Sequence, residues 1–280
     1  MKKSLLILAA ALLGLVSCRS IILEERDGCP SFLFFRIDNE SAFQLYERIH
    51  VGLFRYPEEN LMAADTTSVS EIAGRSFYFD IRNTPAVEGY GLLGYRHCVN
   101  ESGTLWRVPV GAQYDSLFRF SYRVPVERES FTVPVEFTKE HVKVTLRFVG
   151  ADAFTSSAGG QFPFDVVVRG NTCGMDALTG IPVRGPFEYR PREEGMGCFH
   201  FILPRILDHD LSLELYGRPG VAEQEGHTDT FDLWRLLLEK GGVTWQEKNL
   251  PDVEIVLDYR DFDVKVNVQP WGSQDIHFEF

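Results

Sequence analysis

The run His141-Val-Lys-Val-Thr-Leu-Arg-Phe148 decides the fold class, because apolar and polar side chains alternate through it without a break. Successive side chains of an extended chain point to opposite faces, so Val142, Val144, Leu146 and Phe148 share one face. A helix would spread the same residues around its circumference. The run therefore predicts a β-strand with one face in a core and the other in solvent.

The same alternation recurs on both sides of this run. Residues 131–137 place apolar side chains at every second position, and residues 262–268 do so again with polar residues between them. Shorter segments, separated by Gly, Pro and Asn, carry weaker versions of the pattern. Such spacing predicts an all-β protein of packed antiparallel sheets. The weaker strand candidates are Phe32–Ile37, Ile49–Phe54, Phe77–Ile81, Leu92–His97, Phe118–Val124, Pro163–Val168, Phe199–Leu203, Leu211–Tyr216 and Val253–Asp258.

One short helix is expected among these strands. Thr230 is a candidate N-cap, residues 231–240 carry helical spacing, and Gly241-Gly242 would end the helix. Phe231, Trp234 and Leu238 would lie close to one face, which indicates packing against a core.

The segment 150–160 marks the expected boundary between two domains. It follows the strong strand 141–148 and ends in Ser156-Ser-Ala-Gly-Gly160, which lacks bulky apolar residues and is too short for a long flexible tether. We therefore expect an N-terminal β-sandwich over residues 29–150 and a C-terminal β-sandwich, with the helix, over residues 151–280.

The N-terminus has the organisation of a lipoprotein export signal. Lys2 and Lys3 precede an apolar stretch, Leu5–Val16, and small or aliphatic residues lead directly to Cys18. A membrane-spanning helix needs about 20 apolar residues, and Arg19 interrupts the stretch before that length. A soluble export signal is the other alternative. We predict a signal peptide over residues 1–17, a lipid on Cys18 and a spacer over residues 18–28.

Composition excludes several kinds of partner. The chain has a net charge of −12, and 44% of its residues are hydrophobic. Nucleic acid and anionic lipid both demand clusters of Lys and Arg, so the acidic balance argues against either. The apolar content is sufficient for a sizeable core.

Cysteine usage fits an oxidising compartment. With Cys18 carrying lipid, an even set remains, consisting of Cys29, Cys98, Cys173 and Cys198. Three pairings are possible, and we favour Cys29–Cys98 with Cys173–Cys198 because each pair then lies within one expected domain. Zinc is a weaker alternative since no C-x-x-C spacing occurs, and free buried thiols remain open.

Motifs for catalysis are missing from the sequence. It contains no G-x-S-x-G, no H-E-x-x-H and no P-loop. Cys173 lies between glycines, which more often marks a turn than a reactive thiol, and the acids from Asp258 to Asp263 suit a polar hairpin better than a calcium site. We therefore expect no enzyme activity, cofactor, metal or small-molecule substrate.

The C-terminal segment Asp275-Ile-His-Phe-Glu-Phe280 is a candidate donor strand. Ile276, Phe278 and Phe280 would project to one side of an extended chain, with the polar residues on the other. It could complete the protein's own sheet. Alternatively it could insert into a neighbouring subunit, where backbone hydrogen bonds supply affinity and side-chain pockets supply register.

Three stretches together resemble the FimB-type fimbrial anchor lipoproteins of Bacteroidales. The first is Leu15-Val-Ser-Cys18 with Cys29-Pro30 and an aromatic-rich strand after it. The second joins residues 133–137 to residues 142–150, and the third runs from Leu250 through Tyr259 to residues 264–271. The resemblance implies two transthyretin-like β-sandwich domains and a lipidated N-terminus in the outer membrane.

The resemblance also implies a function. A member of this family would hold a fimbria at the cell surface and limit its length, with a fimbrillin shaft subunit as its partner. Because a lipid-held anchor cannot lose its N-terminus and stay attached, we expect it to offer Ile276–Phe280 as a strand. A surface glycan-binding lipoprotein, with Trp106, Trp245 and Trp271 stacking on sugars, is the alternative, and a secreted hydrolase is a third possibility.

Overall fold

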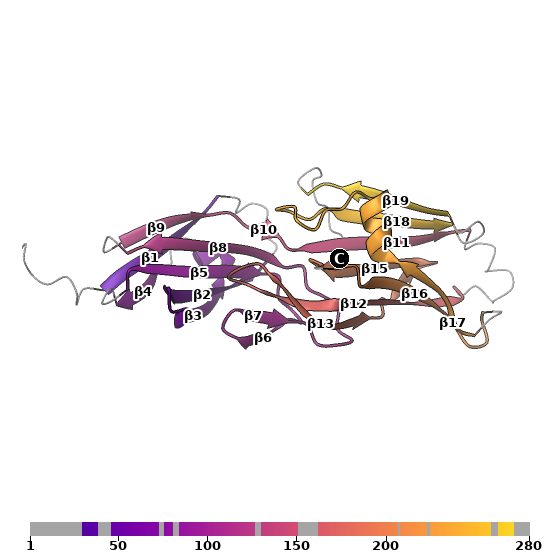
Figure 1. Ribbon diagram of the computed structural model, residues 1–280, viewed down its shortest axis with the longest axis horizontal. Coiled ribbons are helices and arrows are strands. Elements are labelled where there is room, and N and C mark those ends of the chain that lie inside the picture. The colour runs from indigo at the N-terminus through magenta and orange to yellow at the C-terminus, as the bar shows by residue number, and fades with distance from the viewer. Residues whose placement is uncertain are drawn as a thin grey trace, which may run out of the picture.

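The protein is built almost entirely of β-strands, as the alternation predicted. The computed structural model describes residues 30–38, 46–72, 76–80, 84–126, 130–150, 162–206, 208–222, 225–258 and 263–271. Figure 1 shows an elongated molecule whose strands follow the long axis, with one group of sheets at each end and a crowded region between them.

Two facing sheets form the first half. One has the order β4 (Ser76–Asp80), β1 (Pro30–Ile37) and β9 (Ser130–Val135); β1 runs antiparallel to β4 and parallel to β9. The other has the order β10 (Thr138–Lys139), β8 (Phe118–Pro125), β5 (Ala86–Leu93), β2 (Arg48–Tyr56) and β3 (Asn60–Ser68). A single helical turn, α2 (Val69–Ile72), follows β3 and buries Val69 and Ile72.

The core of this half lies between its two sheets. Leu33 and Phe35 of β1 belong to one buried cluster with Val51 and Leu53 of β2, and Phe120 of β8 packs edge-on against the Phe137 ring with centroids 4.9 Å apart. Full burial of one such side chain contributes roughly 1.5–3 kcal/mol. The two sheets are therefore held together by the faces that alternation turns inward.

The second half repeats the arrangement with longer strands. Its first sheet has the order β14 (Glu193–Gly195), β15 (Cys198–Pro204), β11 (His141–Val149), β18 (Asp252–Asp258) and β19 (Asp263–Gln269). Its second sheet has the order β17 (Gly226–Asp232), β16 (Leu211–Gly217), β12 (Phe164–Asp176), β7 (Leu105–Arg107) and β6 (Val99–Ser102), with β13 (Pro182–Tyr189) paired to β12. The apolar face of β11 enters the core between them, as predicted.

The expected helix is present but begins later than predicted. It consists of α4 (Leu233–Arg235) and a π-helical turn, η3 (Leu236–Lys240), and Asp232 is its N-cap, with a side chain that accepts a hydrogen bond from the Arg235 N–H. Thr230 and Phe231 instead pair with β16 as the end of β17. Cross-strand pairing therefore takes these two residues out of the helix.

The chain passes from the sheets of the first half to those of the second at Glu140, and the domain boundary expected at residues 150–160 stays a prediction. β10 pairs with β8 in the first half, whereas β11 pairs with β15 and β18 in the second. The β6–β7 hairpin, although early in the sequence, pairs with β12. Segments from the first half of the chain thus contribute to sheets of the second half.

Most strand candidates match observed strands, and Leu92–His97 is the clearest error. The strand there is β5, which ends at Leu93 and is followed by Gly94 in a left-handed conformation. β5 is buried on both faces, and an added Cβ at Gly91 would collide with the Phe120 ring. In the sequence, glycine was taken to separate strands, whereas within β5 it makes room for aromatic rings of the neighbouring strand.

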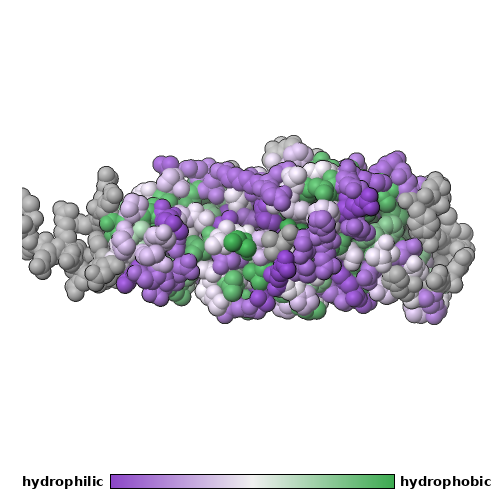
Figure 2. All heavy atoms as spheres, viewed as in Figure 1, coloured by the Kyte–Doolittle hydropathy of each residue, from purple (hydrophilic) through white to green (hydrophobic). Residues whose placement is uncertain are grey.

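The visible surface is predominantly hydrophilic. Figure 2 shows hydrophilic residues over much of one face, with apolar atoms in small groups between them. Within the ranges described above, no helix is long and apolar enough to cross a membrane.

Replacing Gly174 with alanine should destabilise the protein by about 1–3 kcal/mol, the usual cost of overpacking. The new Cβ would collide with the Trp106 carbonyl oxygen and lie 2.9 Å from the Arg107 Cα, forcing β7 away from β12. Urea unfolding of the full chain measures the loss. Gly195→Ala is the matched control, because its Cβ would meet nothing closer than 3.9 Å; equal stability of the two variants would contradict the close packing of β7 on β12.

Candidate functional site

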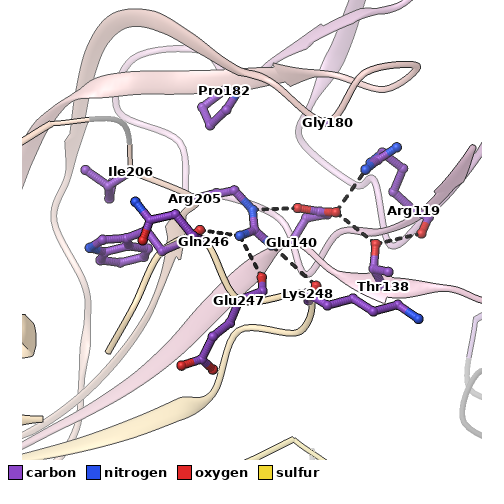
Figure 3. Close-up of a pocket in the computed structure, with 11 residues that line it drawn as sticks. Arg119, Thr138, Glu140, Gly180, Pro182, Arg205, Ile206, Gln246, Glu247 and Lys248 are labelled. Atoms are coloured by element: carbon purple, nitrogen blue, oxygen red, sulfur yellow. Dashed lines mark hydrogen bonds and ion pairs between the residues drawn. The ribbon is translucent and has the colours of Figure 1, made fainter. Parts of the chain in front are cut away.

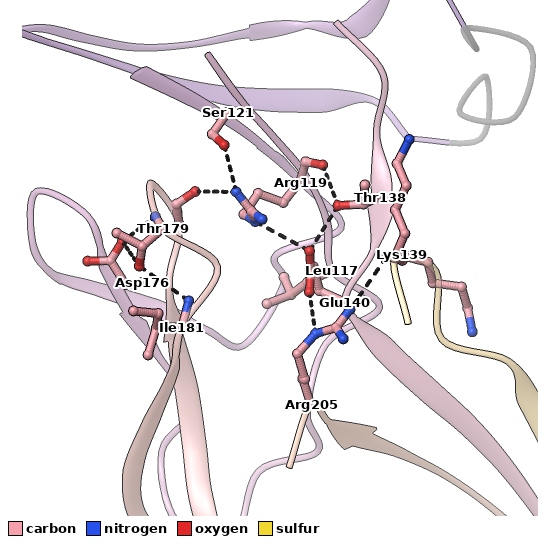
Figure 4. A network of polar contacts seen from close by, with 12 residues as sticks. Leu117, Arg119, Ser121, Thr138, Lys139, Glu140, Asp176, Thr179, Ile181 and Arg205 are labelled. Atoms are coloured by element: carbon pink, nitrogen blue, oxygen red, sulfur yellow. Dashed lines mark hydrogen bonds and ion pairs between the residues drawn. The ribbon is translucent and has the colours of Figure 1, made fainter. Parts of the chain in front are cut away.

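The junction of the two halves is organised around Glu140, a buried carboxylate between β10 and β11. Its side chain is 4% exposed and accepts hydrogen bonds from Arg205 Nε (2.8 Å), Arg119 Nε (3.3 Å) and Thr138 Oγ1 (2.9 Å). Figure 4 shows the two guanidinium groups approaching the carboxylate from different sides. Arg119 belongs to β8 of the first half and Arg205 follows β15 of the second, so one carboxylate joins both halves.

The two arginines extend this network over the surrounding loops. Arg205 donates to the carbonyl oxygens of Trp245 and Glu247, the latter at 2.9 Å. Arg119 donates to Ser121 Oγ at 3.0 Å and to the Leu178 carbonyl at 3.4 Å, in the turn between β12 and β13. Charge-assisted hydrogen bonds of this kind are about twice as strong as neutral ones, so the network fixes loops of the second half onto β8.

Lys139, the preceding residue, is buried and engages the second half. Its Nζ donates to Asp252 Oδ1 (2.7 Å), the Leu250 carbonyl (2.8 Å) and the His141 carbonyl (3.0 Å). Burial lowers the pKa of Lys139, and the Asp252 carboxylate opposes that shift. The three acceptors match the three N–H bonds of an ammonium group, so we assign Lys139 as charged and fully bonded.

His141 completes the junction as a neutral side chain. Burial is the main reason that its pKa lies well below the usual value, and the nearby Lys139 charge adds to the effect. The neutral ring donates from Nδ1 to the Leu117 carbonyl at 3.0 Å and stacks edge-on against the Phe118 ring. It links the first strand of the second half to the segment that leads into β8.

A hollow of about 460 Å³ lies beside this network and is lined in part by Arg119, Glu140, Arg205 and Lys248. Figure 3 shows Glu140 between the two arginines in its wall. The charges of Glu140, Arg119 and Arg205 are already used in bonds to one another. Nor does the described part of the chain hold three or more His, Cys, Asp and Glu side chains grouped to bind a metal ion. The arrangement can stabilise a junction, and it offers no evident set of reacting groups.

Several residues singled out from the sequence lie outside the described ranges. These are the lipidation candidate Cys18, the disulfide candidate Cys29 and the donor-strand residues Ile276, Phe278 and Phe280. The last described residue before the donor segment is Trp271, whose ring lies 6.3 Å from the ring of Phe118 on β8. Trp271 therefore packs against the core of the first half.

The cysteines that are described carry free thiols, so the expected Cys173–Cys198 bridge is not present. Cys173 lies on β12, near the Val183 carbonyl at 3.8 Å, and Cys198 lies on β15 beside His200 Nε2 at 3.6 Å. These strands belong to the two different sheets of the second half. Burial raises the pKa of the Cys98 thiol. The other expected pair, Cys29–Cys98, includes a residue outside the described ranges and stays a prediction.

The tryptophans proposed as a sugar-stacking platform are not arranged as one. Trp106 and Trp245 are only 4% and 5% exposed, and Trp271 packs against the first core. Trp106 Nε1 donates to the Tyr90 hydroxyl at 3.3 Å. Trp106 and Trp245 are core residues of the second half, and they are not the exposed rings that the glycan-binding alternative requires.

Several open edges of the sheets are protected, each in a different way. β13 contains Pro182 and Pro186, and its Glu188 carbonyl accepts the Gly111 N–H at 2.9 Å. β9 contains Pro134. On β19, Lys240 Nζ donates to the Val264 carbonyl at 2.6 Å. Prolines and lysines are common means of preventing an edge from pairing with another chain.

Comparisons with known proteins reveal a similarity of fold without sequence similarity. No family model matches the chain, and no curated protein matches it. Among solved structures it is similar to a candidate polysaccharide-binding protein from Bacteroides thetaiotaomicron, with TM-score 0.59, 10% identity, and 88% of this chain and 100% of that chain covered. A candidate adhesin from Bacteroides ovatus also has TM-score 0.59, with 12% identity and coverage of 88% and 96%.

A third similar structure is the fimbrial anchor protein Mfa2 from Porphyromonas gingivalis. It has TM-score 0.57 and 12% identity, and the match covers 87% of this chain and 98% of that one. The likeness to Bacteroidales fimbrial anchor-type proteins expected from the sequence is therefore confirmed at the level of the fold. The match extends over nearly the whole length of that anchor, so the likeness of fold covers both halves of this chain.

Replacing Glu140 with glutamine should destabilise the protein by roughly 3–5 kcal/mol, because the substitution leaves two poorly exposed guanidinium groups without their counter-charge. Urea unfolding measures the change, and urea does not screen charges as guanidinium does. Glu136→Gln is the control: Glu136 pairs with Lys248 at 2.6 Å, but both side chains are at least half exposed. The Glu136→Gln variant should lose less than about 1 kcal/mol of stability. A loss that small in the Glu140→Gln variant would contradict the role of Glu140 as the central charge of the junction.

Proposed function

We propose that this protein is an outer-membrane lipoprotein that anchors a fimbria to the cell surface and limits its length. The observation that carries the proposal is the match to a fimbrial anchor protein over 98% of that chain. The Lys2-Lys3, apolar stretch and Cys18 pattern at the N-terminus supports attachment through lipid.

The structure of the junction is suited to a load-bearing role. An anchor transmits force between the membrane and a fimbrial shaft, so its two halves must not separate under load. The bonds of Glu140, Lys139 and His141 cross or flank the junction and are shielded from water. Such shielding preserves the strength of polar bonds.

The proposed partner is a fimbrillin shaft subunit, and the proposed contact is strand exchange. The segment Asp275–Phe280 would leave the junction after Trp271 and add to a sheet of the shaft subunit. Epitope-tagged full-length protein should therefore recover a fimbrial shaft subunit from solubilised cell envelopes.

Glycan binding is kept as a second candidate because one similar structure is a candidate polysaccharide-binding protein. The burial of Trp106 and Trp245 counts against it. A glycan array probed with the full chain distinguishes the two functions: specific sugar binding without recovery of any fimbrial subunit would favour the second.

Replacing Cys18 with alanine should abolish acylation and release the protein from the membrane, since the side chain that accepts the lipid is lost. Metabolic labelling with a radioactive fatty acid, followed by fractionation, measures both effects. Cys198→Ala is the control, because Cys198 lies on a folded strand and should leave labelling unchanged. Labelled Cys18→Ala protein would refute the lipid site.

Deleting Asp275–Phe280 should leave a folded, membrane-bound lipoprotein but release fimbriae into the medium, because the donated strand is lost. Immunoblotting of shed fimbriae measures the effect. A control variant in which Asp275 and Glu279 become Asn and Gln keeps the apolar face and should retain fimbriae. Normal retention by the deletion variant would remove strand donation from the proposal.

A further inference from the structure

The hollow beside Glu140 is lined by Arg119, and one nitrogen of this side chain donates no hydrogen bond within the described ranges. A guanidinium group carries five N–H bonds in one plane. Arg119 uses Nε on Glu140 and Nη1 on Ser121 and the Leu178 carbonyl, whereas no described residue accepts from Nη2. Gly180, at a φ of +77°, leaves this nitrogen room, since a Cβ there would collide with it. Nη2 can therefore donate to a ligand.

Arg205 has a similar surplus on the other side of Glu140. Its Nε donates to Glu140, and its Nη1 donates to the Trp245 and Glu247 carbonyls. Its Nη2 makes one contact, to the Lys248 carbonyl at 3.5 Å, which is longer than the usual range of about 2.7–3.2 Å. The two arginines thus offer N–H groups on both sides of the buried carboxylate, as Figure 3 shows.

Cationic side chains outnumber anionic ones in the lining. Three are positive and two are negative, namely Arg119, Arg205 and Lys248 against Glu140 and Glu247. Glu140 is 4% exposed and already accepts three hydrogen bonds, and Figure 3 shows the Glu247 carboxylate pointing away from it. The hollow therefore favours a ligand that accepts hydrogen bonds and carries negative charge.

Lys248 can exchange its present partner for such a ligand. Its Nζ lies 2.6 Å from Glu136 Oε2, and the two side chains are 60% and 50% exposed. A pair this exposed contributes at most about 1 kcal/mol. A ligand carboxylate at the rim can replace Glu136 at little cost.

Apolar residues set the remaining chemistry of the ligand. Pro182, Ile206 and Trp245 also line the hollow, whose volume of about 460 Å³ suits a small organic ligand. A sugar acid would place hydroxyl groups against these side chains, and Trp245, at 5% exposed, offers no open ring for stacking. A peptide with acidic and apolar side chains next to one another matches both parts of the lining.

We propose that this hollow binds a peptide segment of a partner protein in which two acidic side chains flank an apolar one. The carboxylates accept hydrogen bonds from Nη2 of Arg119 and of Arg205, and Lys248 attracts them at the rim. Arginine suits this role because its planar N–H groups match a carboxylate. The contact requires neither lipid nor strand exchange, so its failure and the failure of fimbrial anchoring are separate results.

Nuclear magnetic resonance of the full chain tests the proposal, with tryptophan labelled by nitrogen-15 and Cys18→Ala in every sample to prevent acylation. The probe is acetyl-Glu-Leu-Glu-amide, and acetyl-Gln-Leu-Gln-amide is its neutral control. The acidic peptide should shift the Trp245 indole signal to saturation, and the neutral peptide should bind at least about fivefold more weakly. Trp245→Phe assigns the signal, and Trp234, which lies outside the lining, is the internal reference.

Two variants examine the cationic groups separately. Arg119→Lys keeps a positive charge beside Glu140 but removes Nη2, so the dissociation constant should rise about tenfold or more. Lys248→Gln leaves Glu140 and its arginines intact and should raise the constant about two- to fivefold, as expected for an exposed charge. Lys265→Gln is the matched control on an exposed position of β19 and should leave the constant unchanged.

Three outcomes would overturn the proposal. They are equal affinity for the acidic and neutral peptides, a Trp245 shift with D-glucuronate as large as with the acidic peptide, and normal binding by the Lys248→Gln variant. Urea unfolding checks that each variant is folded. If Arg119→Lys unfolds, Lys248→Gln and the two peptides still decide the question.

Discussion

The structure depends on a carboxylate that is buried between two arginines at the point where the chain leaves one half for the other. Removing Glu140 from water is costly, and the nearby guanidinium groups and Thr138 offset that cost. Because Arg119 and Arg205 come from different halves, the carboxylate is satisfied only when the halves adopt this one arrangement. The same extended chain sends Lys139 the other way, to Asp252. Two adjacent side chains thus fix both sides of the junction.

Apolar packing reinforces that arrangement. Phe54, Tyr90, Leu92 and Leu117 are early in the sequence, yet they belong to the same core cluster as β11, β12 and β15. The Tyr90 hydroxyl also donates to the Gly103 carbonyl at 2.6 Å, within the β6–β7 hairpin. Domains joined by a flexible linker normally move against each other. Here a shared core and a shielded ionic network oppose such motion, which suits a molecule proposed to carry tension.

Sequence alone predicted the elements whose two faces meet different surroundings. β11 and β18 have one face in the core and one in solvent, so their alternation could be read directly. β5 and the C-terminal part of β12 are covered on both faces, and β3 lies at an edge where small polar residues suffice, so none of these alternates in the same way. The junction was missed because Thr-Lys-Glu between two strands resembles a solvated turn. The partners of Glu140 are distant in sequence, and only the lack of Gly or Pro beside it hinted at a buried segment.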